Sequence, residues 1–391
     1  MVSSATGRAR GFLISVLCAG ALTSACDRPV VENPPRLSPD LASLRVPEGF
    51  RVDLFSDAVP EARSMALGPP GVLFLGSRKG DAVRALFDDD GDGRADRIAV
   101  VRDGLKMPNG VAYRDGALIV AETSRLWRFD DIDAWLADPS GPAPAPTLIR
   151  DDLPDDDWHG WKFIRFAPDG ALHVPVGAPC NVCEVDGWYG AIHRLDPETG
   201  EATVVARGVR HTVGFDWDTD GRLWFSDNGR DLMGDDVPPD ELNRVDAPGR
   251  HYGFPFCHGN SIRDPEFGRL GSCDDAVAPV VPFPAHVAAL GIRVYRAGRF
   301  PAEWLGAIFV AEHGSWNRTV PDGYRVSVVR ETDAGWTREV FLEGFLRAEG
   351  AFGRPVDVEV WHDGSLLVSD DRGGRIYRID RIDESPGGGE P

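Results

Sequence analysis

The sequence predicts an all-β protein, a six-bladed β-propeller with long loops on one face. One short phrase recurs six times along the chain, and most copies are about 50 residues apart, a spacing that holds four short strands. The 45 glycines and 31 prolines are spread over all 391 residues, as the many turns of a β protein require. Because a four-stranded unit cannot bury both of its faces alone, we expect six units to stack around one axis.

The phrase is a glycine-containing turn followed by four or five mostly apolar residues and a small or acidic residue. We expect each copy to form the inner strand of one blade, with its small or acidic end facing the axial channel. The copies span residues 71–76, 115–122, 169–177, 220–227, 305–313 and 363–370. The fourth and fifth copies are about 85 residues apart, so the additional residues should form long loops, where function concentrates on a rigid scaffold. A pair of β-sandwiches is the alternative, but it gives no reason for a phrase that recurs at blade spacing.

The first 26 residues have the layout of a secretory signal peptide. Arg8 and Arg10 precede an apolar run, residues 11–22, that is too short to cross a bilayer as a mature helix. The run leads into L-T-S-A-C, which resembles a bacterial lipoprotein processing site and would leave Cys26 as the lipidated first residue. Plain signal cleavage is the alternative. We therefore expect an exported, periplasmic protein that contacts a membrane only through a lipid on Cys26.

The remaining chain divides into a large folded domain between two short polar segments. We expect a proline-rich tether at residues 27–40, the propeller at residues 41–380 and a disordered C-terminal tail at residues 381–391. The chain has 42 basic and 62 acidic residues, a formal net charge of −20, and no extended basic cluster. This charge argues against a nucleic acid or an anionic lipid surface as a partner.

Four cysteines lie in the exported part of the chain. An even number in an oxidising compartment favours disulfides, and we expect Cys180 to pair with Cys183 and Cys257 with Cys273. Covalent haem attachment is excluded at C-N-V-C because Glu184 stands where a histidine is needed. A four-thiolate zinc site is the alternative, but the second pair is spaced too widely for one.

An acidic stretch at residues 87–96 follows the spacing of a calcium loop. Gly93 permits the tight backbone turn that lets alternate oxygens converge on one hard cation. No glutamate stands at the twelfth position, which is Ala99. A structural calcium site and a solvated acidic hairpin are both consistent with this pattern. Positions 1, 3, 5 and 9 of the loop are Asp88, Asp90, Asp92 and Asp96.

Several stretches resemble the soluble quinoprotein sugar dehydrogenases, the glucose and sorbosone dehydrogenase family. The resemblance covers about residues 40–380 and implies a six-bladed propeller that uses pyrroloquinoline quinone (PQQ) and calcium to oxidise a sugar or a related polyol or aldehyde, passing the electrons to a further acceptor. The sorbosone-dehydrogenase-like branch is indicated by A-P-C-N-V-C (178–183) and H-G-S-W-N-R (313–318). The family as a whole is indicated by A-R-G-V-R-H-T-V-G-F-D-W-D (206–218), D-G-R-L-W-F-S-D-N-G (220–229), D-E-L-N (240–243) and Y-G-F-P (252–255).

The resemblance implies a catalytic role for His159. The general base of the family stands nine residues before the Pro-Asp turn of the third phrase, and His159 stands nine residues before Pro168. The alternative is a structural ring packed between Trp158 and Trp161. Arg210 and His211 stand at the positions of the Arg-Asn pair that stacks on the quinone in the family. Arg210 would also stabilise the oxyanion that develops on the substrate.

The resemblance also implies further cofactor and metal ligands. The family has a cofactor-binding arginine before its last blade, and Arg354 corresponds to it. His313 and Trp316 are candidates either for the cofactor pocket or for structural packing. The catalytic calcium would be held by the backbone carbonyls of Gly229 and Arg230, and a structural calcium would be held by Asp240 and Glu241.

The sequence departs from the family at three places. Ala178 stands where an aspartate orients the base, so Asp156 or Asp157 is expected to orient His159 instead. Val356 replaces a second arginine, and H-G-S-W-N-R replaces a lysine. A quinone with three carboxylates needs several cations, so these losses weaken the expectation that it binds.

Two other functions fit the same architecture. A propeller lactonase holds a calcium ion on its axis with carboxylates and an asparagine, and the metal activates water. A non-catalytic propeller binds a glycan or a protein on its long-loop face. The fold does not choose among the three, because propellers host all of them.

Overall fold

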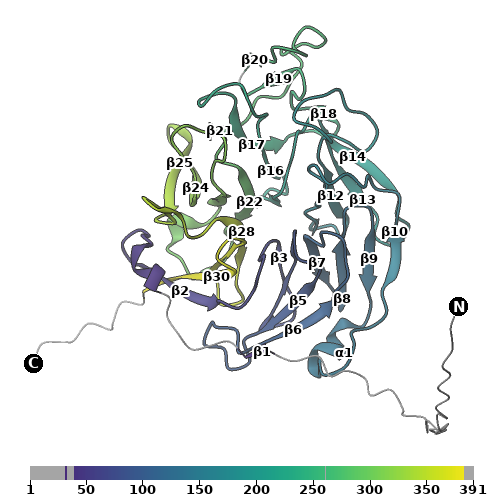
Figure 1. Ribbon diagram of the computed structural model, residues 1–391, viewed down its shortest axis with the longest axis vertical. Coiled ribbons are helices and arrows are strands. Elements are labelled where there is room, and N and C mark those ends of the chain that lie inside the picture. The colour runs from purple at the N-terminus through teal and green to yellow at the C-terminus, as the bar shows by residue number, and fades with distance from the viewer. Residues whose placement is uncertain (1–30, 33–38, 260, 383–391) are drawn as a thin grey trace, which may run out of the picture.

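The computed structural model describes residues 31–32, 39–259 and 261–382, and it is a ring of six β-sheets around a central axis (Figure 1). This confirms the predicted six-bladed, all-β architecture. Among the described residues, no helix is long and apolar enough to cross a membrane. The predicted signal peptide, Cys26, most of the predicted tether and residues 383–391 lie outside the described part of the chain.

The first three blades follow one another along the chain, and the strand nearest the axis is given first in each. Blade 1 contains β3 (Met65–Leu67), β4 (Val72–Leu75), β5 (Val83–Phe87), β6 (Arg97–Arg102) and, at its outer edge, β1 (Val31–Glu32). Blade 2 contains β7 (Gly110–Arg114), β8 (Ala117–Ala121), β9 (Leu126–Phe129) and β10 (Thr147–Arg150). Blade 3 contains β11 (Arg165–Phe166), β12 (Leu172–Val176), β13 (Ala191–Leu195), β14 (Ala202–Arg207) and β18 (Arg250–His251).

The other three blades complete the ring, and five short elements lie between blade strands. Blade 4 contains β15 (Phe215–Trp217), β16 (Leu223–Asp227), β17 (Pro239–Val245) and β21 (Val281–Ala285). Blade 5 contains β22 (Ala289–Val294), β23 (Ile308–Glu312), β24 (Arg325–Thr332) and β25 (Gly335–Leu342). Blade 6 contains β28 (Pro355–Val360), β29 (Leu366–Asp370), β30 (Arg375–Arg381) and β2 (Phe50–Ser56).

Two short hairpins lie outside the six blades: β19 (Cys257–His258) with β20 (Ile262–Arg263), and β26 (Leu346–Arg347) with β27 (Gly350–Ala351). The helical turns are η1 (Pro39–Ser43), α1 (Ile132–Ala137) and η2 (Ala302–Trp304).

The recurring phrase forms the second strand of each blade, so the prediction that it is innermost was wrong. The first strands, such as β3, β7 and β28, contact their counterparts in neighbouring blades around the axis. In the second strands β4, β8, β12, β16, β23 and β29 every residue is buried. A mostly apolar strand belongs where both of its faces are covered, and adjacent blades cover both faces of the second strand.

The acidic residue that ends a phrase binds the loop that leads into the innermost strand. The Asp227 carboxylate accepts hydrogen bonds from the backbone N–H groups of Arg210 at 2.9 Å and His211 at 2.7 Å. The Asp370 carboxylate accepts one from the N–H of Arg354 at 2.8 Å. Because the two strands are antiparallel, the loop before one and the end of the other meet on the same face of the ring. This contact fixes the loops from which a site can be built.

The ring is closed by strands from opposite ends of the chain. β2 pairs antiparallel with β30, with Val52 opposite Ile379 and Leu54 opposite Tyr377. Leu54 and Tyr377 are fully buried in one hydrophobic cluster with residues of blade 5. Two residues of the predicted tether, β1, pair with β6 at the outer edge of blade 1.

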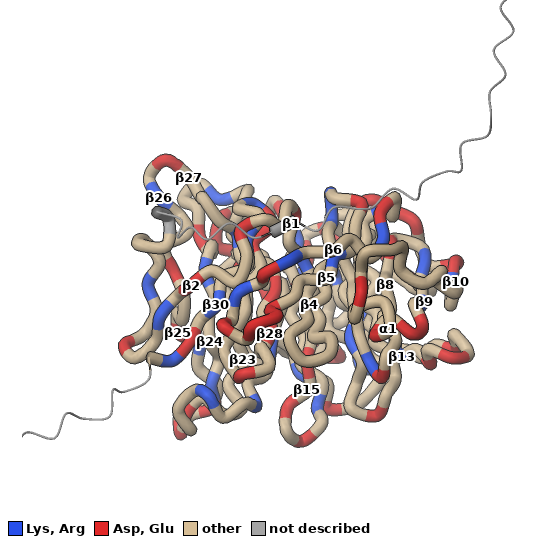
Figure 2. Tube along the Cα trace, turned by 90° about the horizontal axis from the view of Figure 1, so that it is seen from below, with Lys and Arg blue, Asp and Glu red and all other residues tan. Residues whose placement is uncertain are grey.

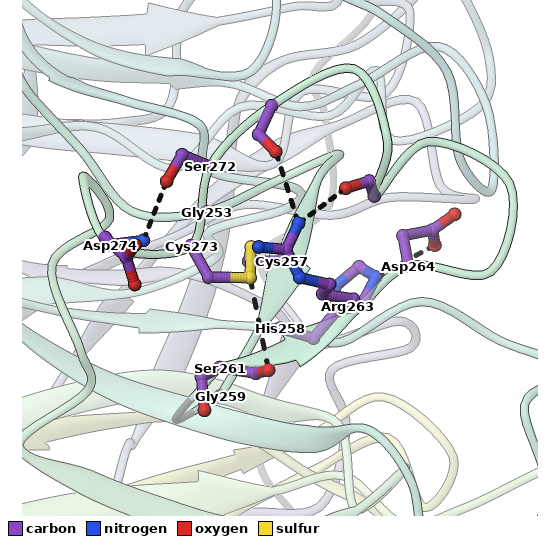
Figure 3. Close-up of a disulfide and its surroundings, with 12 residues drawn as sticks. Gly253, Cys257, His258, Gly259, Ser261, Arg263, Asp264, Ser272, Cys273 and Asp274 are labelled. Carbon is purple, nitrogen blue, oxygen red and sulfur yellow. Dashed lines mark hydrogen bonds and ion pairs between the residues drawn. A yellow bond between two sulfur atoms is a disulfide. The ribbon is translucent and has the colours of Figure 1, made fainter.

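Part of the insertion between the fourth and fifth phrases is sheet, although long loops alone were expected there. β17 and β21 complete blade 4, and β18 pairs parallel with β14 of blade 3. The β19–β20 hairpin carries the disulfide between Cys257 and Cys273, which Figure 3 shows together with its surroundings. Cys180 and Cys183 form the second disulfide, so both predicted pairings are confirmed.

The surface charge is mixed in sign. In the side view of Figure 2, acidic and basic residues are interspersed along the ring, and many of them pair. Arg128 contacts Asp130 at 2.6 Å, and Arg194 contacts Asp169 at 3.0 Å. On the side that Figure 2 shows, the acidic residues are therefore interspersed with basic ones rather than collected in one patch.

Candidate functional site: a histidine and arginine cavity

A cavity of about 480 Å³ opens where the loops before the innermost strands meet the ends of the second strands. This volume falls in the range of small-molecule sites. Five of the predicted catalytic and cofactor residues line it: His159, Arg210, His211, His313 and Trp316. The walls come from blades 1, 3, 4 and 5, so the site exists only in the closed ring.

His159 lines this cavity and is held in one orientation. Its Nδ1 lies 2.9 Å from the backbone carbonyl of Ala178. A carbonyl only accepts, so Nδ1 carries the proton and Nε2 keeps its lone pair. The backbone φ of His159 is +53°, in the left-handed region that costs energy for a residue with a side chain. Its surroundings therefore hold the ring in place.

The surroundings of His159 are aromatic. Its ring stacks on His211 with centroids 4.3 Å apart and an interplanar angle of 14°. Trp158 and Trp161 make edge contacts to it at 5.7 and 6.3 Å. Gly177 permits the stack, because a Cβ there would lie 2.7 Å from atoms of both histidines. His159 thus has the expected aromatic neighbours and also reaches the cavity.

The acceptor that orients His159 is not the one expected. Asp156 accepts a hydrogen bond from the Tyr189 hydroxyl at 2.5 Å, and Asp157 lies 3.2 Å from the Lys106 ammonium. The expectation that one of these carboxylates fixes the tautomer was wrong. The acceptor is the backbone carbonyl of Ala178. The pattern of side chains in the sequence does not reveal a backbone acceptor.

Both stacked histidines are neutral at pH 7. Burial, with a further contribution from Arg210, holds the pKa of His159 well below its usual value of 6.5. Burial and the neighbouring His159 lower the pKa of His211 in the same direction. Neither ring nitrogen of His211 has a hydrogen-bond partner among the described residues, although the side chain is buried.

Arg210 lines the cavity, but its guanidinium is occupied by protein groups. Nε donates to the carbonyl of Asn181 at 2.8 Å, and Nη2 contacts the Asn181 side chain at 2.9 Å and the Asp231 carboxylate at 3.1 Å. Nη1 donates to the carbonyl of Asn228 at 3.2 Å. These contacts fix the loop after β16 against the C-N-V-C loop, so Arg210 builds the wall of the site.

Two cations that sequence reasoning missed line the cavity, Arg63 and Arg78. Arg63 precedes β3 and Arg78 follows β4, so the two residues flank the first two strands of blade 1. The Arg78 guanidinium lies 3.5 Å from the centroid of the Trp161 ring and makes no ion pair with a described residue. Burial, with Arg63 as the next cause, lowers the pKa of Arg78 to about 10, so it remains charged at pH 7. For Arg78, its position two residues after the first phrase is the signal that could have found it.

Arg63, Asp371 and His313 form a chain that ends at the cavity. Asp371 accepts from Arg63 Nη1 at 2.8 Å and contacts His313 Nε2 at 2.9 Å. Burial lowers the pKa of His313 to about 4, even though Asp371 raises it. Arg354 does not line the cavity, because its guanidinium donates to the carbonyls of His313 and Gly314. Arg354 thus supports His313 from behind.

The predicted metal residues are divided between the cavity and its surroundings. Gly229 and Asp240 line the cavity, and Asp240 accepts from the N–H of Gly229 at 2.8 Å. Glu241 lies behind the wall and accepts from the N–H of Gly259 at 2.7 Å. The side chain of Arg230 pairs with Asp264 at 2.6 Å, outside the cavity lining. Burial raises the pKa of Asp240 to about 7 and that of Glu241 to about 8.

The remaining predicted positions lie elsewhere. Asp88, Asp90, Asp92 and Asp96 do not line the cavity and stand between β5 and β6. Val356, at the place of the second arginine, packs with Trp161 and Leu290 in an apolar cluster. Arg63 and Arg78 therefore supply the positive charge that Val356 cannot.

The cavity fits an anionic, planar ligand such as PQQ. Arg78 is an unpaired cation within the described chain, and the indole N–H of Trp161 is a buried donor without a partner. The two ring nitrogens of His211 also have no hydrogen-bond partner among the residues that the structure describes. Buried polar groups are rarely left unpaired, so this wall is arranged for a polar ligand that completes its hydrogen bonds.

The fold and the site define a six-bladed propeller with an axial cavity of histidines and arginines. The chain belongs to the family of the domain of unknown function DUF7133, whose model matches residues 37–378. An uncharacterized protein of Borreliella burgdorferi is 31% identical over 353 residues, which cover 86% of this chain and 91% of that protein.

Solved structures share the fold. The PQQ domain of the pyranose dehydrogenase from Coprinopsis cinerea, in its holo form, has a TM-score of 0.73 at 20% identity and covers 89% of this chain and 98% of its own. The PQQ-bound aldose sugar dehydrogenase of Streptomyces coelicolor has a TM-score of 0.61 at 20% identity, with 86% and 99% covered. The soluble aldose sugar dehydrogenase of Escherichia coli, in its apo form, has a TM-score of 0.59 at 16% identity, with 85% and 100% covered.

Proposed function

We propose that this protein is a PQQ- and calcium-dependent dehydrogenase that oxidises a sugar or a related polyol or aldehyde. The observation that carries the proposal is His159, which the Ala178 carbonyl orients. Within the described part of the chain, its Nε2 has no hydrogen-bond partner, and Arg78, a cation without an ion pair there, lines the same cavity. A base and an anion-binding wall in one cavity are what this oxidation needs. The quinone-binding proteins that share the fold support the same cofactor.

Proton removal is the step that the chain itself performs. Nε2 of His159 takes the proton of the substrate hydroxyl as the substrate carbon loses a hydride and a carbonyl forms. When bound, PQQ supplies the two-electron acceptor for that hydride. Arg78, Trp161 and His211 would hold the cofactor, and the exposed indoles of Trp158 and Trp316 offer apolar faces to a sugar ring at the rim.

The backbone of the loop after β16 is the proposed site of the catalytic calcium. Gly229 lies in the cavity wall next to Asp240 and Asn228, so oxygen ligands of the kind that calcium prefers are available there. Arg210 holds this loop through Asn228 and Asp231. Its role is therefore positioning as well as charge.

Reconstitution tests the proposal. The purified chain, starting at residue 27, is mixed with PQQ and Ca²⁺, and reduction of a redox dye is followed with a panel of aldoses. Sorbosone belongs in the panel because A-P-C-N-V-C and H-G-S-W-N-R are similar to the sorbosone branch. Dye reduction that needs both the quinone and a substrate is expected. Absence of quinone binding would contradict the proposal. Hydrolysis of sugar lactones by the same chain would favour the lactonase, and glycan binding without a reaction would favour the non-catalytic propeller.

A matched pair of variants tests the anion-binding wall. Arg78→Gln should weaken quinone binding about tenfold or more, because a charge-assisted hydrogen bond contributes about 1.5–3 kcal/mol. Arg102→Gln removes the same charge from an exposed position on β6 and should leave binding unchanged. Equal affinities of Arg78→Gln and the wild type would exclude Arg78 from the site.

We also propose export to the periplasm with a lipid on Cys26, a residue outside the described structure. The support is the signal-like N-terminus alone. Mass spectrometry of the mature N-terminal peptide should find a diacylated Cys26, and Cys26→Ser should release the protein from the membrane fraction. An unmodified mature N-terminus beyond residue 26 would contradict the anchor.

A further inference from the structure

Three carboxylates converge on the loop between β5 and β6, and none of them lines the cavity. One oxygen each of Asp88, Asp90 and Asp96 lies within 4.8 Å of the others. Asp92, at the fifth position of the predicted calcium loop, is not in this group, and its carboxylate accepts instead from the N–H of Arg94 at 2.8 Å. The structure thus brings together three of the four aspartates that the spacing predicted.

The cluster has no compensating cation. None of the three carboxylates has an arginine or lysine within ion-pair distance in the described chain, because Arg97 pairs with Asp89 at 2.6 Å instead. Three negative charges within a few ångströms repel one another strongly unless a cation or protons neutralise them.

Asp88 adds an independent sign of a missing ligand. Asp88 is only 7% exposed, and its Oδ1 has no hydrogen-bond partner among the described residues. The other oxygen, Oδ2, accepts from the N–H of Gly93 at 3.1 Å. A buried carboxylate that belongs to a three-carboxylate group and has an oxygen without a donor is suited to a bound cation.

The loop touches the blade that closes the ring. The N–H of Ala95 donates to the carbonyl of Phe55 in β2 at 2.8 Å. Gly93, with φ of +84°, lies against the side chain of Arg378 in β30, and a Cβ there would be 2.6 Å from its Nε. The loop of blade 1 therefore packs on both strands that join the two ends of the chain.

We propose that Asp88, Asp90 and Asp96 bind one Ca²⁺ ion that fixes the β5–β6 loop against β2 and β30. Calcium fits because the site offers carboxylate oxygens on an irregular loop, which is the ligand set and geometry that calcium accepts. The ion would act on ring closure, and it is separate from the calcium of the proposed active site.

Calcium binding to the whole exported chain tests this site. The chain from residue 27, stripped with a chelator, is titrated with Ca²⁺ alone by calorimetry and by equilibrium dialysis. Asp88→Asn with Asp90→Asn should remove one bound Ca²⁺ per chain. Asp333→Asn, an exposed carboxylate in the β24–β25 turn, is the matched control and should bind as the wild type does. Asp90→Asn alone changes an exposed residue, so it remains folded and should weaken the site about tenfold or more.

Hydrogen exchange provides the second readout. Ca²⁺ should slow exchange of the amides of β2 and β30 in the wild type and in Asp333→Asn, and have no such effect in the double variant. Dye reduction with PQQ should persist in the double variant, which separates this site from the proposed function. An unchanged number of bound Ca²⁺ ions in the double variant would overturn the proposal, and so would an unchanged affinity in Asp90→Asn. Calcium binding without any change in exchange would overturn it as well.

Discussion

At the scale of single residues, the site depends on how His159 is held. The Ala178 carbonyl fixes the proton on Nδ1, the stack on His211 fixes the ring plane, and burial keeps the ring neutral. A residue that only filled space would not need a fixed tautomer facing a cavity. The same ring does contact Trp158 and Trp161, so packing and catalysis make different predictions for its removal.

His159→Ala should lower turnover by roughly 10² to 10⁴ in the reconstituted enzyme and leave the melting temperature nearly unchanged. The ring is partly exposed at the cavity, so its loss leaves a space that water can enter. Steady-state dye reduction and thermal unfolding check this together. His362→Ala removes an exposed histidine after β28 and serves as the control. A large fall in melting temperature with unchanged turnover would instead favour the packing role.

The pH dependence of activity should reflect the lowered pKa of His159. A base is active when unprotonated, so a folded-state pKa well below 6.5 extends the active range toward lower pH. We expect kcat/KM to stay level from about pH 8 to pH 6 and to fall only below that range. A profile that loses activity through a midpoint near 6.5 would show that His159 titrates normally or is not the base.

At the scale of elements, the blades are regular and the insertion is where this chain differs from a plain repeat. β17 and β21 give blade 4 its outer strands, while the β19–β20 hairpin extends from the ring and is tied by Cys257–Cys273. Arg230 connects this hairpin to the cavity wall through its ion pair with Asp264. The disulfide therefore stabilises a segment that supports the site.

Breaking Cys257–Cys273 should cost about 3 kcal/mol, because it closes a loop with a sequence separation of 16. Cys180–Cys183, with a separation of 3, should cost about 2 kcal/mol by the same chain-entropy reasoning. Denaturant unfolding of paired Cys→Ser variants measures both. Thiol titration of the unfolded, unreduced chain from residue 27 should find no reactive cysteine, and two reactive thiols would mean that one bridge is absent.

At the scale of the whole molecule, closure of the ring creates the cavity. The cavity takes residues from blades 1, 3, 4 and 5. Blade 6 lies between blades 5 and 1 and must be complete to join them. β2 supplies the last strand of blade 6 from the N-terminal side, and its Leu54 and Phe55 are fully buried. Function and global stability thus depend on the same strand.

A chain that starts at residue 57 and so lacks β2 should lose its cooperative unfolding transition and aggregate, because the edge of β30 and its apolar neighbours become exposed. A chain that starts at residue 39 keeps β2 and should retain the transition. Circular dichroism during heating and size-exclusion chromatography check both. A folded, monomeric chain without β2 would show that closure does not need this strand.

Sequence alone predicted the number of blades, the disulfide pairs and part of the lining of the cavity. These features follow from local patterns, since a phrase that recurs at blade spacing must be covered by its neighbours. The resemblance to the sugar dehydrogenases, rather than a local pattern, pointed to His159 and Arg210, and both residues line the cavity. Cysteine pairing followed from count and compartment.

Tertiary structure decided which strand is innermost, what orients His159 and which cations line the cavity. Which strand is innermost depends on the adjacent blades, because they cover both faces of the strand that the phrase forms. The group that orients His159 is the Ala178 carbonyl, and every residue has a backbone carbonyl, so the sequence does not single this one out. Arg63 and Arg78 reach His159 only because the ring brings blade 1 to blade 3 across the axis. Contacts of this kind join residues that are far apart in sequence, and no local pattern of hydrophobic and polar residues records them.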